Sequence, residues 1–365
     1  MREIASAEIF VVVRELRDKL VGKRLNNFYD LGSGSFRLDF EGNLSVYVLL
    51  TKTLNETKFK ERAQEATPFS IALRKRIKGS RLAGMEQKGS DRIVVFEFAG
   101  ASKQLLVLEM FAKGNMLLLD SQRNIELVYA SRKLKERALV AKARYSFPRS
   151  DAIDFRFDEK AVLDAIARAA MEQDAKLITA LSKYVNIGPI YLEELIRKAG
   201  LDPVASSSKL LDKQRELAAA LLDFRSAMDA PKPVAYCDES DKVVDYAILP
   251  ISKYAGYKRI EYATLSQLLD DIYAQERTKT VDEERERALN ELRKSIETQK
   301  ELENEYAAKA GIYREIANKI FEHMSAVNEA ISAARQKKGE EEIAIQGIKV
   351  LKIDRQNKVM HIEME

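Results

Sequence analysis

The chain has 365 residues, 46% of them hydrophobic, and a formal net charge of +4, which suits two or three compact units. One cysteine and two histidines exclude an internal disulfide and a Cys/His zinc cluster, and no apolar run reaches the roughly 18 to 20 residues of a membrane-spanning helix. We therefore expect a cytoplasmic protein without a signal peptide, structural zinc or a membrane partner.

Residues 1–150 are expected to form a first domain in which helices pack on a mainly antiparallel sheet. Apolar residues between Ala5 and Leu20 share one helix face, and Gly22 ends this helix. A second helix is predicted from Pro68 to Ile77, because proline suits a first helical position. Alternating residues and Gly-Ser or Gly-Asn turns predict strands from Arg24 to about Leu50, and again in RLAGMEQ, DRIVVFEFAG, KQLLVLEMFA, NMLLLD and NIELVYAS.

Residues 151–262 are expected to form a second, mainly helical domain. Apolar residues three and four apart predict four helices between residues 158 and 229. The second and third helices are separated by Asn186-Ile187-Gly188-Pro189, which predicts a tight turn. Strands in PVAYCD, VVDYAILP and KRIEYATL complete this part of the chain.

Residues 263–365 are expected to form a coiled-coil domain with a small β-hairpin. One apolar seam comprises Tyr313, Ala317, Ile320, Met324, Val327, Ile331 and Ala334, and a looser seam comprises Leu289, Leu292, Ile296, Leu302 and Tyr306. Two seams in one chain predict an antiparallel helical hairpin that folds back on itself and ends at Gly339, although pairing between chains stays open. The alternating tail around Asp354 predicts the β-hairpin.

Basic residues are clustered even though the net charge is small. Residues 74–81 read RKRIKGSR and residues 132–144 read RKLKERALVAKAR, and each run could neutralise several phosphates. From composition alone, a solvated helix face is an equally good interpretation. The candidate contacts to a nucleic-acid backbone are Arg74, Lys75, Arg76, Lys78, Arg81, Lys113, Arg132, Lys133, Lys135 and Lys183.

The sequence carries no recognisable catalytic motif. It has no P-loop lysine motif, no GxGxxG turn and no nucleophile elbow. We interpret His323 as a helix-surface residue and His361 as a strand residue. The run Leu31–Ser35 joins two predicted strands and opens no helix, so it is interpreted as a hairpin turn. We therefore expect no catalytic residue, no cofactor and no metal site.

Asp91 and Arg92 lie where a predicted turn enters a strand. A pair in this position offers a carboxylate and a guanidinium to one ligand. The guanidinium could hold a phosphate or stack on a base, while the carboxylate accepts a hydrogen bond from a base or ribose. Taken alone, a turn-capping aspartate beside a solvated arginine is the better interpretation.

Five stretches of the sequence carry a family resemblance. They are AEIFVVVRELRDKLVGKRLNNFYD, LRKRIKGSRLAGMEQKGSDRIVVFEF, LEMFAKGNMLLLD, NIGPIYLEELIRKAGLDP and AAKAGIYREIANKIFEHMSAVNEAISAARQKKG. These stretches resemble the NFACT family of ribosome-quality-control factors. The resemblance implies an α+β fold: an antiparallel β domain with helices that is similar to formamidopyrimidine-DNA glycosylases, a helix–two-turn–helix module and a coiled-coil middle domain. It also implies that an RNA-binding domain normally follows, so this chain is expected to be part of something longer.

The resemblance also assigns roles to residues. It implies that Asp91 and Arg92, with Glu8 where the family has an aspartate, recognise tRNA. It implies that Asn186 and Gly188, at the turn of the helical module, bind nucleic-acid backbone, while Pro189 removes one amide donor. The expected partners are tRNA and the large ribosomal subunit, with self-association through the coiled coil as a further expectation.

The implied function is support of mRNA-independent C-terminal tailing of stalled nascent chains, with peptide transfer left to the ribosome. Two alternatives remain at this point. One is a glycosylase-like DNA-repair protein, which is disfavoured because the family resemblance places Arg2 where those enzymes have a catalytic proline, and because one cysteine cannot form their zinc finger. The other is a coiled-coil scaffold or fibronectin-binding adhesin.

Overall fold

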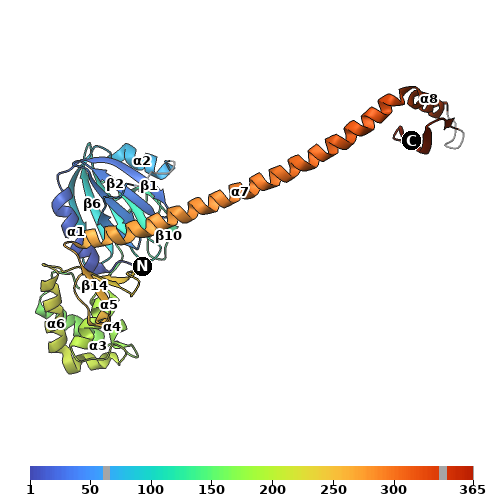
Figure 1. Ribbon diagram of the computed structural model, residues 1–365. Helices are drawn as coiled ribbons and strands as arrows, with labels where there is room; N and C mark the ends of the chain where they lie inside the picture. Colours follow the sequence, from blue (N-terminus) through green and yellow to red (C-terminus); the bar gives the residue numbers. More distant parts are fainter. Residues whose placement is uncertain (61–65, 337–342, 365) are drawn as a thin grey trace. The chain divides into compact units, whose positions relative to one another are not determined.

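The chain divides into two compact units, Met1–Arg277 and Thr278–Glu365. The structure, a computed structural model shown in Figure 1, describes residues 1–60, 66–336 and 343–364, and the side chains of 275–285, 287 and 288 are not described. No described helix is both long and apolar enough to cross a membrane. The finer division of the first unit at residue 150 stays a prediction.

Two antiparallel sheets form the first part of the first unit. One has the order β1-β2-β3-β4 and the other β5-β6-β7-β8-β9. The strands are β1 (Leu25–Gly32), β2 (Ser35–Phe40), β3 (Leu44–Leu49), β4 (Thr53–Glu56), β5 (Arg81–Gln87), β6 (Ile93–Ala99), β7 (Lys103–Glu109), β8 (Asn115–Leu119) and β9 (Ile125–Val128). The predicted antiparallel sheet and α+β class are confirmed, while β4 and the short pair β10 (Arg132–Lys133) and β11 (Ala138–Leu139) were not predicted.

Helix α1 (Ser6–Leu20) contributes to the main hydrophobic core of this unit. Its Ile9, Val12 and Leu16 are at most 1% exposed, as the apolar periodicity predicts. Helix α2 (Pro68–Ile77) begins with Pro68 at its first position, and the Thr67 side chain accepts a hydrogen bond from the Ser70 amide at 3.2 Å. Both helix predictions are confirmed.

A smaller core covers the other face of the five-stranded sheet. It contains Ile93, Val95, Val107, Leu117, Leu119, Ile125, Leu139 and Tyr145. Alternation along the strands explains this second cluster, because successive side chains point to opposite faces of a sheet. The Tyr145 hydroxyl donates to Glu109 at 2.9 Å, and Arg137 pairs with the same carboxylate. The segment after β9 is thereby fixed on the sheet.

Helices follow in the second part of the first unit, as predicted. They are α3 (Glu159–Ala170), α4 (Leu177–Tyr184), α5 (Pro189–Lys198), the 3-10 helix η1 (Ser207–Lys213) and α6 (Gln214–Ala227). Three strands, β12 (Val234–Cys237), β13 (Val243–Ala247) and β14 (Lys258–Glu261), form a sheet of order β13-β12-β14. The 3-10 helix η2 (Ser252–Tyr254) lies between β13 and β14 in the chain. The tight turn between α4 and α5 is confirmed, with Gly188 at φ +106°.

The predicted antiparallel helical hairpin is wrong. Helix α7 (Leu265–Glu322) runs without interruption through 58 residues, so the looser seam and the first three residues of the other seam lie on one helix and cannot pack against each other as two arms. Gly311 does not break it, because a single interior glycine costs only about 1 kcal/mol relative to alanine. Leu292, Tyr306 and Tyr313 are 60%, 63% and 68% exposed.

The second unit contains most of α7, from Thr278 onwards, together with helix α8 (Met324–Arg335) and a small sheet. His323 lies at the break before α8, so the second seam is divided between two helices. The sheet has the order β15 (Ala344–Ile345), β16 (Ile348–Asp354) and β17 (Val359–Met364), and the predicted β-hairpin at Asp354 is confirmed. Gly339, the predicted end of the helices, lies outside the described residues.

Candidate functional site: an arginine-lined cavity beside the first helix

The segment before α1 joins the two parts of the first unit. The Ala7 amide donates to the Ile187 carbonyl, in the α4–α5 turn, at 3.3 Å. A Cβ built on Gly188 would lie 2.6 Å from the Ala5 Cβ, so only glycine allows the turn to approach this closely. The start of α1 and the turn therefore pack as one surface.

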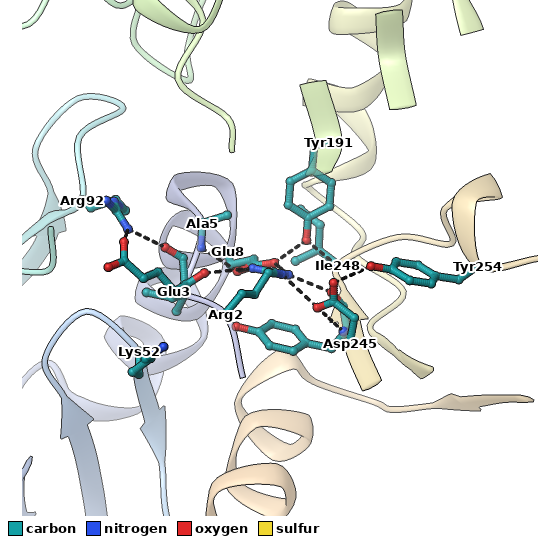
Figure 2. Close-up of polar contacts among 12 residues, drawn as sticks. Arg2, Glu3, Ala5, Glu8, Lys52, Arg92, Tyr191, Asp245, Ile248 and Tyr254 are labelled. Atoms are coloured by element: carbon teal, nitrogen blue, oxygen red, sulfur yellow. Dashed lines mark hydrogen bonds and ion pairs between the residues drawn. The ribbon is translucent and has the colours of Figure 1, made fainter. Parts of the chain in front are cut away.

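Arg2 is the centre of the polar contacts in Figure 2. Its guanidinium pairs with both Glu8 carboxylate oxygens, and its Nε donates to Asp245 in β13 at 2.9 Å. It also donates to the Tyr246 carbonyl at 2.8 Å, and its Cζ lies 4.4 Å from the Tyr246 ring centroid. Burial lowers the pKa of Arg2, but Glu8, Tyr246 and Tyr191 together more than offset this effect, so the pKa is raised and the guanidinium stays charged.

Glu8 is completely buried and has several structural partners. Its carboxylate accepts from the Ala5 amide at 2.7 Å, which satisfies a free donor at the start of α1, and from the Tyr191 hydroxyl at 2.7 Å. The Tyr191 oxygen in turn accepts from the Ile248 amide at 2.9 Å. Burial, followed by the nearby Glu8 charge, raises the pKa of Tyr191. Glu8 thus connects α1, α5 and the residue following β13.

Asp91 and Arg92 lie at the end of the β5–β6 loop, as predicted. The Ser90 carbonyl accepts from the Ser6 hydroxyl and from the Asn186 side-chain amide, the latter at 2.8 Å. Gln87 donates to the Asp91 carbonyl at 2.8 Å. The backbone on which Arg92 stands is therefore held by α1 and by the α4–α5 turn together.

The two side chains of this pair have different partners. Arg92 donates to Glu3 at 2.6 Å, and the arginine side chain is 26% exposed (Figure 2). Burial raises the pKa of Asp91, while a hydrogen bond with Ser150 opposes the shift. The carboxylate and the guanidinium are thus not paired with each other.

A cavity of about 560 Å³ opens beside Arg92, a volume typical of ligand pockets. Arg2, Arg92 and Lys253 contribute positive charge to its wall, and Glu3, Glu193 and Asp245 contribute negative charge. Asn186, Gly188 and the apolar residues Val185 and Ile190 complete part of the lining. Such a wall can bind an anionic group together with a flat apolar one.

The structure brings only some of the predicted site residues to this cavity. Arg92, Asn186 and Gly188 line it, whereas Glu8 and Asp91 do not. None of the ten predicted backbone-contacting cations is among the lining residues. Lys183 instead pairs with Glu172 at 2.6 Å, and Arg76 pairs with Glu126 at 3.2 Å.

The basic clusters contain both engaged and unpaired side chains. Arg74 donates to the Phe28 carbonyl at 2.6 Å, and Arg81 donates to the Gly22 carbonyl. Arg132 is partly buried. The candidates that are exposed and have no ion pair within the described part of the chain are Lys75, Lys78, Lys113, Lys133 and Lys135. These five keep their charge available to a polyanion.

Sequence reasoning missed four residues that shape the cavity, namely Arg2, Glu3, Asp245 and Lys253. Arg2 and Asp245 are 243 positions apart, and no local pattern indicates that they meet. Glu3 reaches Arg92 across 89 positions. Among the described residues, no group of three or more histidine, cysteine, aspartate or glutamate side chains is arranged to hold a metal ion.

Comparison with known proteins shows which family the chain belongs to. The archaeal Rqc2 homolog aRqcH of Methanocaldococcus jannaschii is 24% identical over 386 residues, covering 98% of this chain and 55% of the relative. Ribosome quality control complex subunit 2 of Schizosaccharomyces pombe is 37% identical over 134 residues, covering 34% of this chain and 13% of the relative. The chain thus spans about half of the archaeal relative and a smaller part of the yeast one.

The solved N-terminal structure of the fibronectin/fibrinogen-binding protein from Streptococcus suis shares the fold. It covers 74% of this chain and 98% of its own, with a TM-score of 0.59 and 18% identity. The family described as NFACT N-terminal and middle domains matches residues 7–363. The chain belongs to the NFACT family.

Proposed function

We propose that this chain is a ribosome-quality-control factor of the cytoplasm that holds tRNA on an obstructed large ribosomal subunit. In this role it supports mRNA-independent tailing of stalled nascent chains, and the ribosome carries out peptide transfer. Membership of the NFACT family and the names of the archaeal and yeast relatives support the proposal. The exposed apolar side chains of α7 support pairing with another helix.

The observation that supports the tRNA proposal most directly is the position of Arg92 in the wall of the cavity. It lines a cavity together with Arg2 and Lys253, and its backbone is held through Ser90 by two other elements. Because a guanidinium held in place loses little conformational freedom on binding, it is well suited to grip a phosphate or stack on a base. The chain's part in tailing is then to position a substrate.

Replacing Asp91 and Arg92 together by alanine is expected to weaken tRNA binding at least about tenfold, since a charge-assisted contact to phosphate or base is lost. The thermal melt should change little, because the ion pair of Arg92 is with the exposed Glu3 and Asp91 is only partly buried. Fluorescence anisotropy with labelled tRNA at graded salt measures the first quantity, and calorimetry the second.

The matched control for that variant is Arg215→Ala with Asp223→Ala, which removes the same two charges from exposed positions on α6. It is expected to bind tRNA like the wild type. If the Asp91/Arg92 variant also binds tRNA normally while remaining folded, the cavity is not the tRNA site and the proposal fails.

Glu3→Gln is expected to tighten tRNA binding by up to about fivefold. The Glu3 carboxylate occupies Arg92, so an RNA phosphate must displace it, and an exposed ion pair is worth roughly 0.2–1 kcal/mol. Glu193→Gln removes the same charge from the same cavity, but Glu193 pairs with Arg197. If anisotropy shows that both variants bind tRNA more tightly by the same factor, the gain comes from the general loss of negative charge and not from the release of Arg92.

A further inference from the structure

A basic groove lies on the five-stranded sheet and shares no lining residue with the Arg92 cavity. Its volume is about 700 Å³. Its lining includes residues of β5, β6 and β7, and the apolar part of its floor is formed by Val95 and Leu105. Its rim includes residues from the end of α1, from the β8–β9 turn and from the part of the chain that follows Tyr145, the last residue of the smaller core. None of its lining residues belongs to the basic clusters identified in the sequence.

The rim of this groove carries unpaired positive charge. Lys88, Arg123 and Arg156 are exposed and have no ion pair within the described residues. Two further cations are compensated, since Lys103 pairs with Glu97 at 2.7 Å and Arg17 with Asp18 at 3.6 Å. The remaining carboxylate, Glu86, leaves the groove with an excess of positive charge.

Phe147 places two of these cations together. The Lys88 ammonium lies 5.2 Å from the centre of its ring, and the Arg123 guanidinium lies 5.5 Å from it. The ring is fixed in turn by an edge contact with buried Tyr145 at 5.2 Å. Cation–π attraction at these distances holds the two side chains over the groove before any ligand binds.

We propose that this groove binds a short single-stranded segment of RNA. Phosphates are held by Lys88, Arg123 and Arg156, and a base or ribose packs on the apolar floor beside Phe147. Single-stranded nucleic acid is bound elsewhere by the same combination of a cationic rim with aromatic and apolar surface. This site is separate from the one proposed for tRNA at Arg92, so either can fail without the other.

The backbone of the floor favours RNA over an acidic peptide. β6 and β7 are interior strands, and their amides and carbonyls are already paired with neighbouring strands. An extended peptide lying over these two strands would therefore find no backbone partners there, although such partners supply much of the affinity in strand-addition binding. A nucleotide needs only the side-chain contacts that the groove offers.

The test uses anisotropy of a labelled short oligouridylate on the full chain. Arg123→Glu is expected to weaken binding about tenfold, and Phe147→Leu, which keeps an apolar group over the smaller core, about threefold to fivefold. Arg215→Glu on α6 makes the same charge change outside the groove and should have little effect. The variant with Asp91→Ala and Arg92→Ala should bind the oligouridylate normally.

Three results would overturn the inference. Equal weakening by Arg123→Glu and Arg215→Glu would mean that the RNA is attracted by net charge alone. Binding of a fully paired, blunt-ended RNA duplex as tight as that of the oligouridylate would exclude a preference for single strands. Arg123-dependent binding of polyglutamate at the same affinity would make the groove a site for acidic peptides.

Discussion

Replacing Glu8 by alanine is expected to lower the free energy of unfolding of the first unit by about 3 kcal/mol, because it breaks a buried ion pair. Arg2 keeps only Asp245 as a charged partner, and the Ala5 amide and the Tyr191 hydroxyl lose their acceptor. Calorimetry and urea unfolding measure the loss.

Two variants show what part of this loss comes from charge. Glu8→Gln keeps a hydrogen-bond acceptor without the negative charge, so its stability should fall between those of alanine and the wild type. Glu3→Ala, at an exposed position in the same segment, should cost less than about 1 kcal/mol. If Glu8→Ala melts like the wild type, the Arg2–Glu8 pair contributes nothing to stability.

The same variants separate two roles for Glu8. The family resemblance implies that this residue recognises tRNA, whereas its complete burial suits a residue that positions Arg2 and the start of α1. A Glu8→Gln protein that is stable but binds tRNA poorly would support the first role. A protein that loses stability and tRNA binding in parallel would support the second.

Gly188→Ala is expected to destabilise the first unit by about 3 kcal/mol. Its φ of +106° disfavours any side chain, at a cost of roughly 1–3 kcal/mol, and the new Cβ would lie 2.6 Å from the Ala5 Cβ. Both effects act where the α4–α5 turn meets the segment before α1. Calorimetry of the purified variant gives the change in melting temperature.

Substitutions at two other glycines, and a second substitution at Ala5, separate the cost of backbone strain from the cost of the steric clash. Gly200→Ala carries backbone strain, at φ +77°, but no contact within 4 Å, and Gly256→Ala carries neither. Adding Ala5→Gly to Gly188→Ala removes the clash and should restore part of the lost stability. No recovery in this double variant would mean that backbone strain alone explains the loss.

The elements that sequence predicts well are those with local signals. Helix α2 has proline at its first position and threonine before it, and the strand β6 follows a turn rich in glycine and serine. The hairpin prediction for α7 failed because an apolar seam indicates that a helix has a partner without indicating where the partner lies. Nothing between the two seams turns the chain.

The candidate site is only partly visible in the sequence. Arg92 and the glycine turn follow from local patterns and resemblance and line the cavity, whereas Asp91, predicted with them, does not line it. The burial of Glu8 could not be foreseen, because it depends on Arg2, Tyr191 and Tyr246, which come together only in the folded chain. Polar contacts between residues far apart in the chain produce no periodic pattern in the sequence.

The distances along the chain within the Arg2 network also set an order for folding during synthesis. Tyr191 is synthesised 183 residues after Glu8, and Asp245 is synthesised 243 residues after Arg2. At roughly 5–20 residues per second, this delay is on the order of ten to fifty seconds. Slow translation before residue 245 therefore delays the completion of this buried polar network, and until then Arg2 lacks Asp245 as a partner.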